Sequence, residues 1–147
     1  MLNFRLPMSL KNLAVTIVAL TTFANLFMNN AWADEGYPFD MKKKYPKAFA
    51  AFQKIVPAKF KKNAWVYSLS GTAGPMSATQ CGGKKCLTGS VCQPHDCGGN
   101  QLAFVIAEDG SSATGLLRST NLTQDKDVLF GKPNAAQLAL LKKELGE

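Results

Sequence analysis

The sequence predicts a single α+β domain, in which helices near both ends flank an antiparallel sheet of about five strands. Three observations predict this class. Apolar residues recur at helical spacing near the start and the end of the domain, and short strand-like segments separated by turn residues lie between them. Four cysteines are clustered inside the strand region, and they predict a protruding, disulfide-closed loop between two strands.

The N-terminus has the pattern of a secretory signal peptide. Arg5 and Lys11 precede a largely apolar stretch over residues 13–28, and Ala31-Trp32-Ala33 supplies the small residues of a cleavage site. A retained membrane anchor is the alternative, but the apolar stretch is shorter than the ~20 residues a spanning helix needs. We therefore expect a signal peptide over residues 1–33, no membrane span, a periplasmic location, and one functional domain over residues 34–147.

The first helix is expected to begin at Tyr45-Pro46, because proline is well tolerated in a first turn. Its apolar face comprises Phe49, Phe52, Ile55 and Val56, and Pro57 ends it. A second helix is expected to open at Pro133. Its buried stripe is predicted from the three leucines Leu138, Leu141 and Leu145.

Strands are predicted where aromatic and branched residues concentrate between turn signals. Residues 71–75 are expected to form a turn, and Asp109-Gly110 is a strong signal for a tight hairpin. The predicted strands are residues 64–69, 76–80, 87–91, 101–107 and 112–118, with a weaker one at 128–130.

An excess of lysine remains once the predicted signal peptide is removed. Taking Arg5 and Lys11 from the 17 basic residues leaves 15 against 10 acidic ones, a formal charge of +5. Much of it lies in residues 42–44 and in Lys59, Lys61 and Lys62. No nucleic-acid-binding motif accompanies these lysines, so a solvated helix face is favoured and no nucleic-acid partner is expected. An alternative is a module that binds an anionic cell-envelope glycan or peptidoglycan through them.

The cysteines can pair in three ways in an oxidising compartment. The sequential pairing, Cys81–Cys86 with Cys92–Cys97, closes two loops of equal spacing and is preferred. The nested pairing, Cys81–Cys97 with Cys86–Cys92, would suit two paired strands and remains open.

The second of these loops contains the chain's single histidine. Pro94 restricts the backbone, a disulfide would close the ring, and a rigid exposed loop loses little conformational entropy on docking. The alternative is a structural disulfide with an incidental histidine. The candidate binding residues are Cys92, Gln93, Pro94, His95, Asp96 and Cys97.

Catalysis is disfavoured by the same residues. One histidine beside disulfide-bonded cysteines offers no base–nucleophile pair, and most of the 10 acidic residues lie at termini, loops or helix ends. Spacing of the type C-x4-C differs from the C-x-x-C of thiol oxidoreductases and lacks the usual zinc spacing. We expect no enzyme, no cofactor and no metal.

The loop resembles the signature of the bacterial inhibitors of vertebrate lysozyme, the Ivy family, whose motif is matched by Cys-x-Pro-His-Asp-Cys at residues 92–97. The resemblance covers roughly residues 63–119. It departs from the family pattern at Gln93, where lysine is typical, and in the additional pair Cys81 and Cys86. Flanking segments similar to the family are Ala64-Trp65-Val66, Gly71-Thr72 with Pro75, Gly98, and Thr114-Gly115-Leu116.

This resemblance implies a proteinaceous inhibitor of c-type lysozyme in a Gram-negative cell. Evasion of host defence and control of the cell's own wall-cleaving enzymes both remain open as its role. The loop would enter the enzyme's cleft, where His95 approaches the two catalytic carboxyl groups. Gln93 and Pro94 would line the cleft wall, while Asp96 holds the presentation of the ring. Monomer and homodimer both remain open. Vertebrate lysozymes of this class are basic, so long-range attraction to a chain of charge +5 is not expected to drive association.

Overall fold

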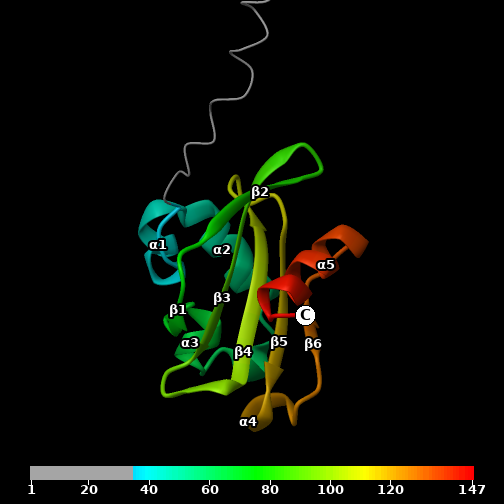
Figure 1. Cartoon of the computed structure of the whole chain (residues 1–147). Helices are drawn as coiled ribbons and strands as arrows, with labels where there is room; N and C mark the ends of the chain where they lie inside the picture. The colour runs from blue at the N-terminus through cyan, green and yellow to red at the C-terminus, as the bar shows by residue number, and fades with distance from the viewer. Residues whose placement is uncertain (1–34) are drawn as a thin grey trace, which may run out of the picture. The chain divides into compact units, whose positions relative to one another are not determined.

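An antiparallel sheet of six strands forms the centre of the computed structural model, which describes residues 35–147 (Figure 1). The strand order is β1-β3-β4-β5-β6, and β2 pairs beside β1 along the long strand β3. The α+β class is confirmed. The strands are β1 (Thr72–Ala73), β2 (Ser77–Cys81), β3 (Lys84–Gln93), β4 (Asp96–Ala107), β5 (Ala113–Ser119) and β6 (Val128–Phe130).

Strand β4 is buried on both faces, because helices cover both sides of the sheet. Leu102, Phe104 and Ile106 pack into one apolar cluster, whereas Ala103 and Val105 pack into another. Alternate residues of a strand point to opposite faces, so the two clusters lie on opposite sides. The helical segments are η2 (Pro38–Asp40), α1 (Met41–Lys44), α2 (Pro46–Ile55), η3 (Ala58–Phe60), α3 (Ala64–Tyr67), α4 (Thr120–Thr123) and α5 (Ala135–Glu144).

The predicted first helix is present as α2, with Pro46 in its first turn. It buries Phe49 and Phe52 in the first cluster, and the Phe52 ring meets Phe104 edge-to-face with centroids 6.3 Å apart. This contact joins α2 to the strand that continues into the cysteine loop.

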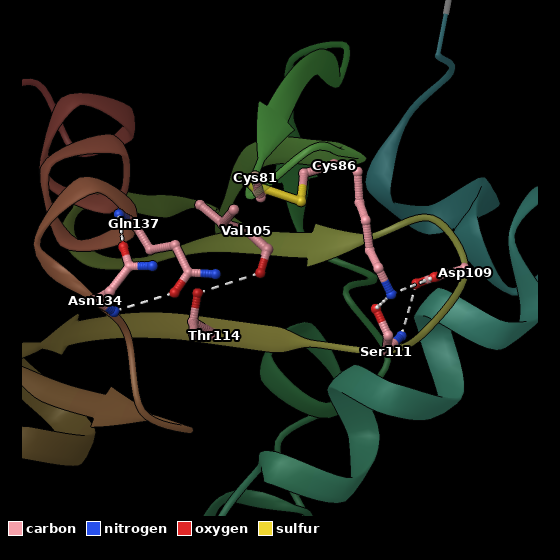
Figure 2. The surroundings of a disulfide bond; sticks show 9 residues. Cys81, Cys86, Val105, Asp109, Ser111, Thr114, Asn134 and Gln137 are labelled. Atoms are coloured by element: carbon pink, nitrogen blue, oxygen red, sulfur yellow. Dashed lines mark hydrogen bonds and ion pairs between the residues drawn. A yellow bond between two sulfur atoms is a disulfide. The ribbon is translucent and has the colours of Figure 1, made fainter.

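The C-terminal helix α5 covers the other face. Asn134 caps it by accepting from the backbone N–H of Gln137, whose side chain accepts from the Asn134 N–H in return (Figure 2). Leu141 is fully buried, and Leu145 packs beside it as predicted. The third predicted member, Leu138, is only partly buried, and Leu140 packs against the cluster instead.

Two predictions between α2 and β2 are wrong. Residues 64–69, predicted as a strand, contain helix α3, and Trp65 and Val66 both enter the first cluster. Adjacent residues of a strand would point to opposite faces. Leu69 also enters this cluster, but it follows the helix with a φ of 52°. The predicted turn over residues 71–75 contains the two-residue strand β1.

The cysteines pair sequentially in this structure. Cys81–Cys86 closes the β2–β3 hairpin (Figure 2), and Cys92–Cys97 closes the β3–β4 turn. The two disulfides therefore lie toward opposite ends of β3. The predicted signal peptide lies outside the described residues. Among residues 35–147, no helix is long and apolar enough to cross a membrane.

Candidate functional site

The cysteine loop forms the tip of the β3–β4 hairpin. Its last paired residues are Gln93 and Asp96, so Pro94 and His95 form a two-residue turn. The strands thus extend further than the predicted segments 87–91 and 101–107, almost to the tip. Pro94, His95 and Asp96 are exposed, and the disulfide lies directly behind them. The tip is therefore a narrow wedge whose most exposed groups are a proline ring, an imidazole and a carboxylate.

His95 adopts a left-handed backbone conformation, with a φ of 67°. Proline followed by a residue of positive φ is the combination of a type II turn, where glycine or asparagine is usual. Histidine tolerates this region better than most side chains. The closed ring and the Gln93–Asp96 pairing hold this conformation, so the position of the imidazole relative to β3 and β4 is fixed by the backbone.

A buried polar network lies beneath the loop. Asn100, on β4, is fully buried and donates from Nδ2 to Asp96 Oδ2 at 2.8 Å. Its Oδ1 accepts from the Ser119 hydroxyl and from the Asn121 N–H, the latter at 3.3 Å. These contacts connect the loop to α4, which begins directly after β5. No sequence pattern predicts these contacts, because Asn100 and Ser119 are 19 residues apart and no local motif joins them.

A hollow of about 340 Å³ lies beside the tip, lined by residues 62–65, Ser70, Gln93 and Pro94. Gly71 allows this close approach, because a Cβ there would lie 2.2 Å from the Cys92 carbonyl oxygen. The lining of the hollow therefore includes Gln93 from the loop and Ala64 and Trp65 from helix α3. Lys62 gives its rim a positive charge.

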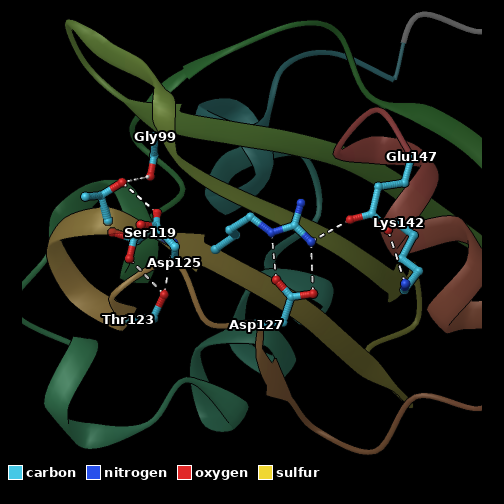
Figure 3. Close-up of polar contacts among 9 residues, drawn as sticks. Gly99, Ser119, Thr123, Asp125, Asp127, Lys142 and Glu147 are labelled. Carbon is cyan, nitrogen blue, oxygen red and sulfur yellow. Dashed lines mark hydrogen bonds and ion pairs between the residues drawn. The ribbon is translucent and has the colours of Figure 1, made fainter.

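The other polar clusters lie away from the tip. Lys84 pairs with Asp109 and Ser111 at the β4–β5 hairpin (Figure 2). The Arg118 guanidinium binds Asp127 through two hydrogen bonds of 2.7 and 2.9 Å (Figure 3). Among residues 35–147, no group of three or more His, Cys, Asp or Glu side chains could hold a metal ion.

The fold and the tip define a binding protein that presents a constrained hairpin from a rigid sheet. Residues 48–146 match the family model described as inhibitor of vertebrate lysozyme (Ivy), and this chain belongs to that family. The match extends beyond residues 63–119, where the resemblance was noted. The members of this family are protein inhibitors and not enzymes, and membership points to lysozyme as the class of target.

Curated relatives agree with this assignment. An inhibitor of vertebrate lysozyme from Escherichia coli K12 is 32% identical over 99 residues, which are 67% of this chain and 62% of the relative. An inhibitor of vertebrate lysozyme from Pseudomonas aeruginosa is 36% identical over 52 residues, 35% of this chain and 34% of the relative. An uncharacterised protein of the same organism is 36% identical over 104 residues, 65% of this chain and 67% of the relative. The aligned region is thus less than two thirds of the Escherichia coli relative's length.

Proposed function

We propose that this protein inhibits c-type lysozyme by inserting the loop of residues 92–97 into the enzyme's active-site cleft. The observation that carries the proposal is the exposed His95 at the point of a disulfide-closed turn. A tip held in one conformation loses little entropy on binding. The family assignment supplies the class of target, and the geometry of the tip supports this mode of contact.

The chemistry of the tip suits the chemistry of the cleft. Glycoside hydrolysis uses two carboxyl groups with the sugar between them. A protonated imidazole placed there would donate charge-assisted hydrogen bonds to those groups and occupy the volume of the sugar. Pro94 and Gln93 line the hollow beside the tip, so they would contact the cleft wall as the loop enters.

The test is lysis of a peptidoglycan substrate by c-type lysozyme, with wild-type protein compared with His95 variants. His95→Gly is the sharper variant, because glycine accepts a φ of 67° and the turn survives without the imidazole. His95→Ala removes the same ring but strains the turn. We expect each to raise Ki at least about 30-fold, which corresponds to the ~2 kcal/mol of an interface hot spot.

A matched control comes from the other hairpin. Gln80 is exposed on β2, which pairs with the opposite part of β3, and Gln80→Ala should leave Ki unchanged. If the wild type inhibits lysozyme and His95→Gly inhibits it equally well, the inhibitory function stands but the insertion of His95 is refuted. No inhibition by the wild type at all would refute the proposed function.

A periplasmic location, reached through a signal peptide cleaved after Ala33, is part of the proposal. It is supported by the order of charged, apolar and small residues before the cleavage site. It is also supported by the two disulfides, which an oxidising compartment favours. Export would place the inhibitor where it meets lysozyme entering from a host. Intact-mass measurement of the protein from a periplasmic extract tests it, with Asp34 expected as the first residue.

A second candidate function is favoured by one surface feature. Tyr37 and Phe39 are 40% and 52% exposed, and their rings stack in parallel with centroids 5.2 Å apart. The exposed Lys42 and Lys43 follow in the next helix, α1. Flat aromatic rings beside ammonium groups suit an anionic envelope glycan. Sedimentation with purified peptidoglycan tests this, and Phe39→Ser with Lys42→Gln and Lys43→Gln should abolish binding that His95→Gly preserves.

A further inference from the structure

Asn100 is a buried amide with both of its ends occupied. Its Nδ2 donates to Asp96 in the loop, and its Oδ1 accepts from the Ser119 hydroxyl and the Asn121 N–H. A buried amide left unpaired is costly, whereas a fully paired one favours a single arrangement of its neighbours. Asn100 is therefore suited to fixing one segment of the chain against another.

The groups that donate to Asn100 Oδ1 belong to the start of helix α4. Ser119 begins this helix, and its hydroxyl accepts from the Leu122 N–H at 3.0 Å. The Thr123 hydroxyl accepts from the Ser119 N–H at 3.0 Å, and the Thr120 hydroxyl donates to the Gly99 carbonyl at 3.2 Å (Figure 3). The same serine thus caps α4 and binds Asn100, so the position of α4 relative to Asn100 is fixed.

The group that accepts from Asn100 Nδ2 is Asp96, in the loop. The Asp96–Asn100 bond spans Gly98 and Gly99, two residues that lack a Cβ and restrict the backbone least. The disulfide fixes the shape of the ring but does not extend over these glycines. The bond from Asn100 does, and a weaker contact of 3.5 Å from Asn121 Nδ2 to Gln93 Oε1 joins α4 to the other side of the loop.

We propose that Asn100 is a positioning residue that locks the loop of residues 92–97 against α4, so that the tip meets lysozyme in one orientation. This inference rests on the proposed function, which it deepens by assigning a residue that does not touch the enzyme. Its effect on inhibition acts through the order of the loop. Only a side chain that donates at one end and accepts at the other serves both partners.

The decisive variant is Asn100→Asp. It has nearly the same shape and keeps the acceptor for Ser119 and Asn121, but it loses the donor and places a second carboxylate beside Asp96. We expect 15N relaxation of the free protein to show lower backbone order over residues 93–98, and Ki to rise at least about 10-fold. A loss of order is expected because the Asp96–Asn100 bond that spans the two glycines is then absent, and only the Thr120 contact to the Gly99 carbonyl remains beside them.

The reciprocal exchange provides the rescue. In the double variant Asp96→Asn with Asn100→Asp, the amide at residue 96 donates to the carboxylate at residue 100, and the bond re-forms with its ends reversed. We expect loop order to return to its wild-type value. Asp96→Asn alone retains an acceptor for Asn100 and should also leave loop order unchanged. Because residue 96 lies in the binding loop, the Ki of the double variant is compared with the Ki of Asp96→Asn alone, and the two should agree within about 3-fold.

A control separates positioning from stability. Thr114 is buried on β5, and its hydroxyl donates to the Val105 carbonyl at 3.2 Å, away from the loop (Figure 2). Thr114→Val removes one buried hydrogen bond from the same strand pair. It should lower the melting temperature and leave loop order and Ki at wild-type values.

The two readouts separate the inference from the function on which it rests. Unchanged loop order in Asn100→Asp would overturn the inference, as would a disordered loop with wild-type Ki, or a double variant that is not rescued. A wild-type protein that fails to inhibit lysozyme would refute the proposed function. The relaxation data would still decide whether Asn100 orders the loop.

Discussion

Glu35 is a buried carboxylate near the start of the described chain, with a side chain only 3% exposed. The Tyr45 hydroxyl donates to it, and Lys85 Nζ lies 3.0 Å from Oε1 and 3.2 Å from Oε2. Burial opposes ionisation, but the Tyr45 hydrogen bond and the Lys85 ammonium outweigh it, and the pKa of Glu35 is lowered. Glu35 thereby joins the N-terminal segment to β3.

Replacing this carboxylate tests its contribution to stability. A folded-state pKa below the unfolded value of 4.5 means that the ionised group stabilises the fold above pH 4.5. That contribution is lost as pH falls through the folded-state pKa. We expect Glu35→Gln to lower the free energy of unfolding by about 2 kcal/mol at pH 7, and the difference from wild type to shrink below pH 4.5. Urea denaturation between pH 7 and pH 2.5 measures it.

Glu108 is the matched control, since it binds the same Lys85 Nζ at 3.0 Å from a side chain that is 40% exposed. Solvent screens such a pair, so Glu108→Gln should cost less than about 0.5 kcal/mol at pH 7. Equal losses in the two variants, or a Glu35→Gln difference that does not vary with pH, would contradict this account of Glu35.

Single residues were predictable from the sequence where their role is local. His95 is the chain's one histidine inside a cysteine-bounded hexapeptide, so composition and spacing alone drew attention to it. Asn100 and Glu35 gave no such signal. Asn100 meets Ser119 across two strands, and Glu35 meets Lys85 over a separation of 50 residues. The first pair is set by the register of β4 against β5, and the second by the packing of the N-terminal segment on β3, neither of which a local motif records.

At the level of elements, periodicity was reliable where one face of a segment is buried. Helix α2 and strand β6 have nearly the predicted bounds. It failed at α3, because the aromatic and branched residues of 64–67 have strand propensity, yet they form a helical turn that buries the adjacent Trp65 and Val66 in one cluster. Tertiary packing overrides local propensity in so short a segment.

The two hairpin disulfides form a natural pair for experiment. Each joins cysteines five residues apart, so removing either should cost a similar amount, about 2 kcal/mol by the chain-entropy relation. Cys81→Ser with Cys86→Ser opens the hairpin distant from the tip, whereas Cys92→Ser with Cys97→Ser opens the tip itself. We expect comparable losses in unfolding free energy, but a raised Ki, by at least about 10-fold, only in the second variant.

Calorimetry and the lysis assay together measure both quantities. The first double variant controls for loss of a crosslink, because it has the same number of serines and one remaining disulfide. A rise in Ki for both variants would indicate that general loosening of the sheet weakens inhibition. An unchanged Ki for the opened tip would show that the constraint on the loop is unnecessary.

For the whole molecule, composition predicted the charge but not its arrangement. The domain over residues 34–147 has a formal charge of +5, yet no lysine or arginine lies between Cys86 and Arg118, the span that contains the loop. The nearest cation lining the hollow beside the tip is Lys62, on the segment that leads into α3. The sequence showed that this span contains no cation and three acidic residues, Asp96, Glu108 and Asp109, but only the fold brings Lys62 to the side of the tip.

This arrangement predicts how salt affects binding to a basic lysozyme. Two positive molecules repel over the Debye length, which shrinks from about 30 Å at 0.01 M salt to about 8 Å at 0.15 M. Screening should therefore raise kon by about 2- to 10-fold across that range. The dissociation rate should change little, because it is governed by the close contacts of the loop, which salt screens much less than it screens long-range repulsion. Stopped-flow measurement of kon against NaCl concentration, with KCl as a check on ion-specific effects, gives the slope. A kon that falls as salt rises would mean that Asp96 and the acidic residues near α4 steer the enzyme to the tip despite the net charge.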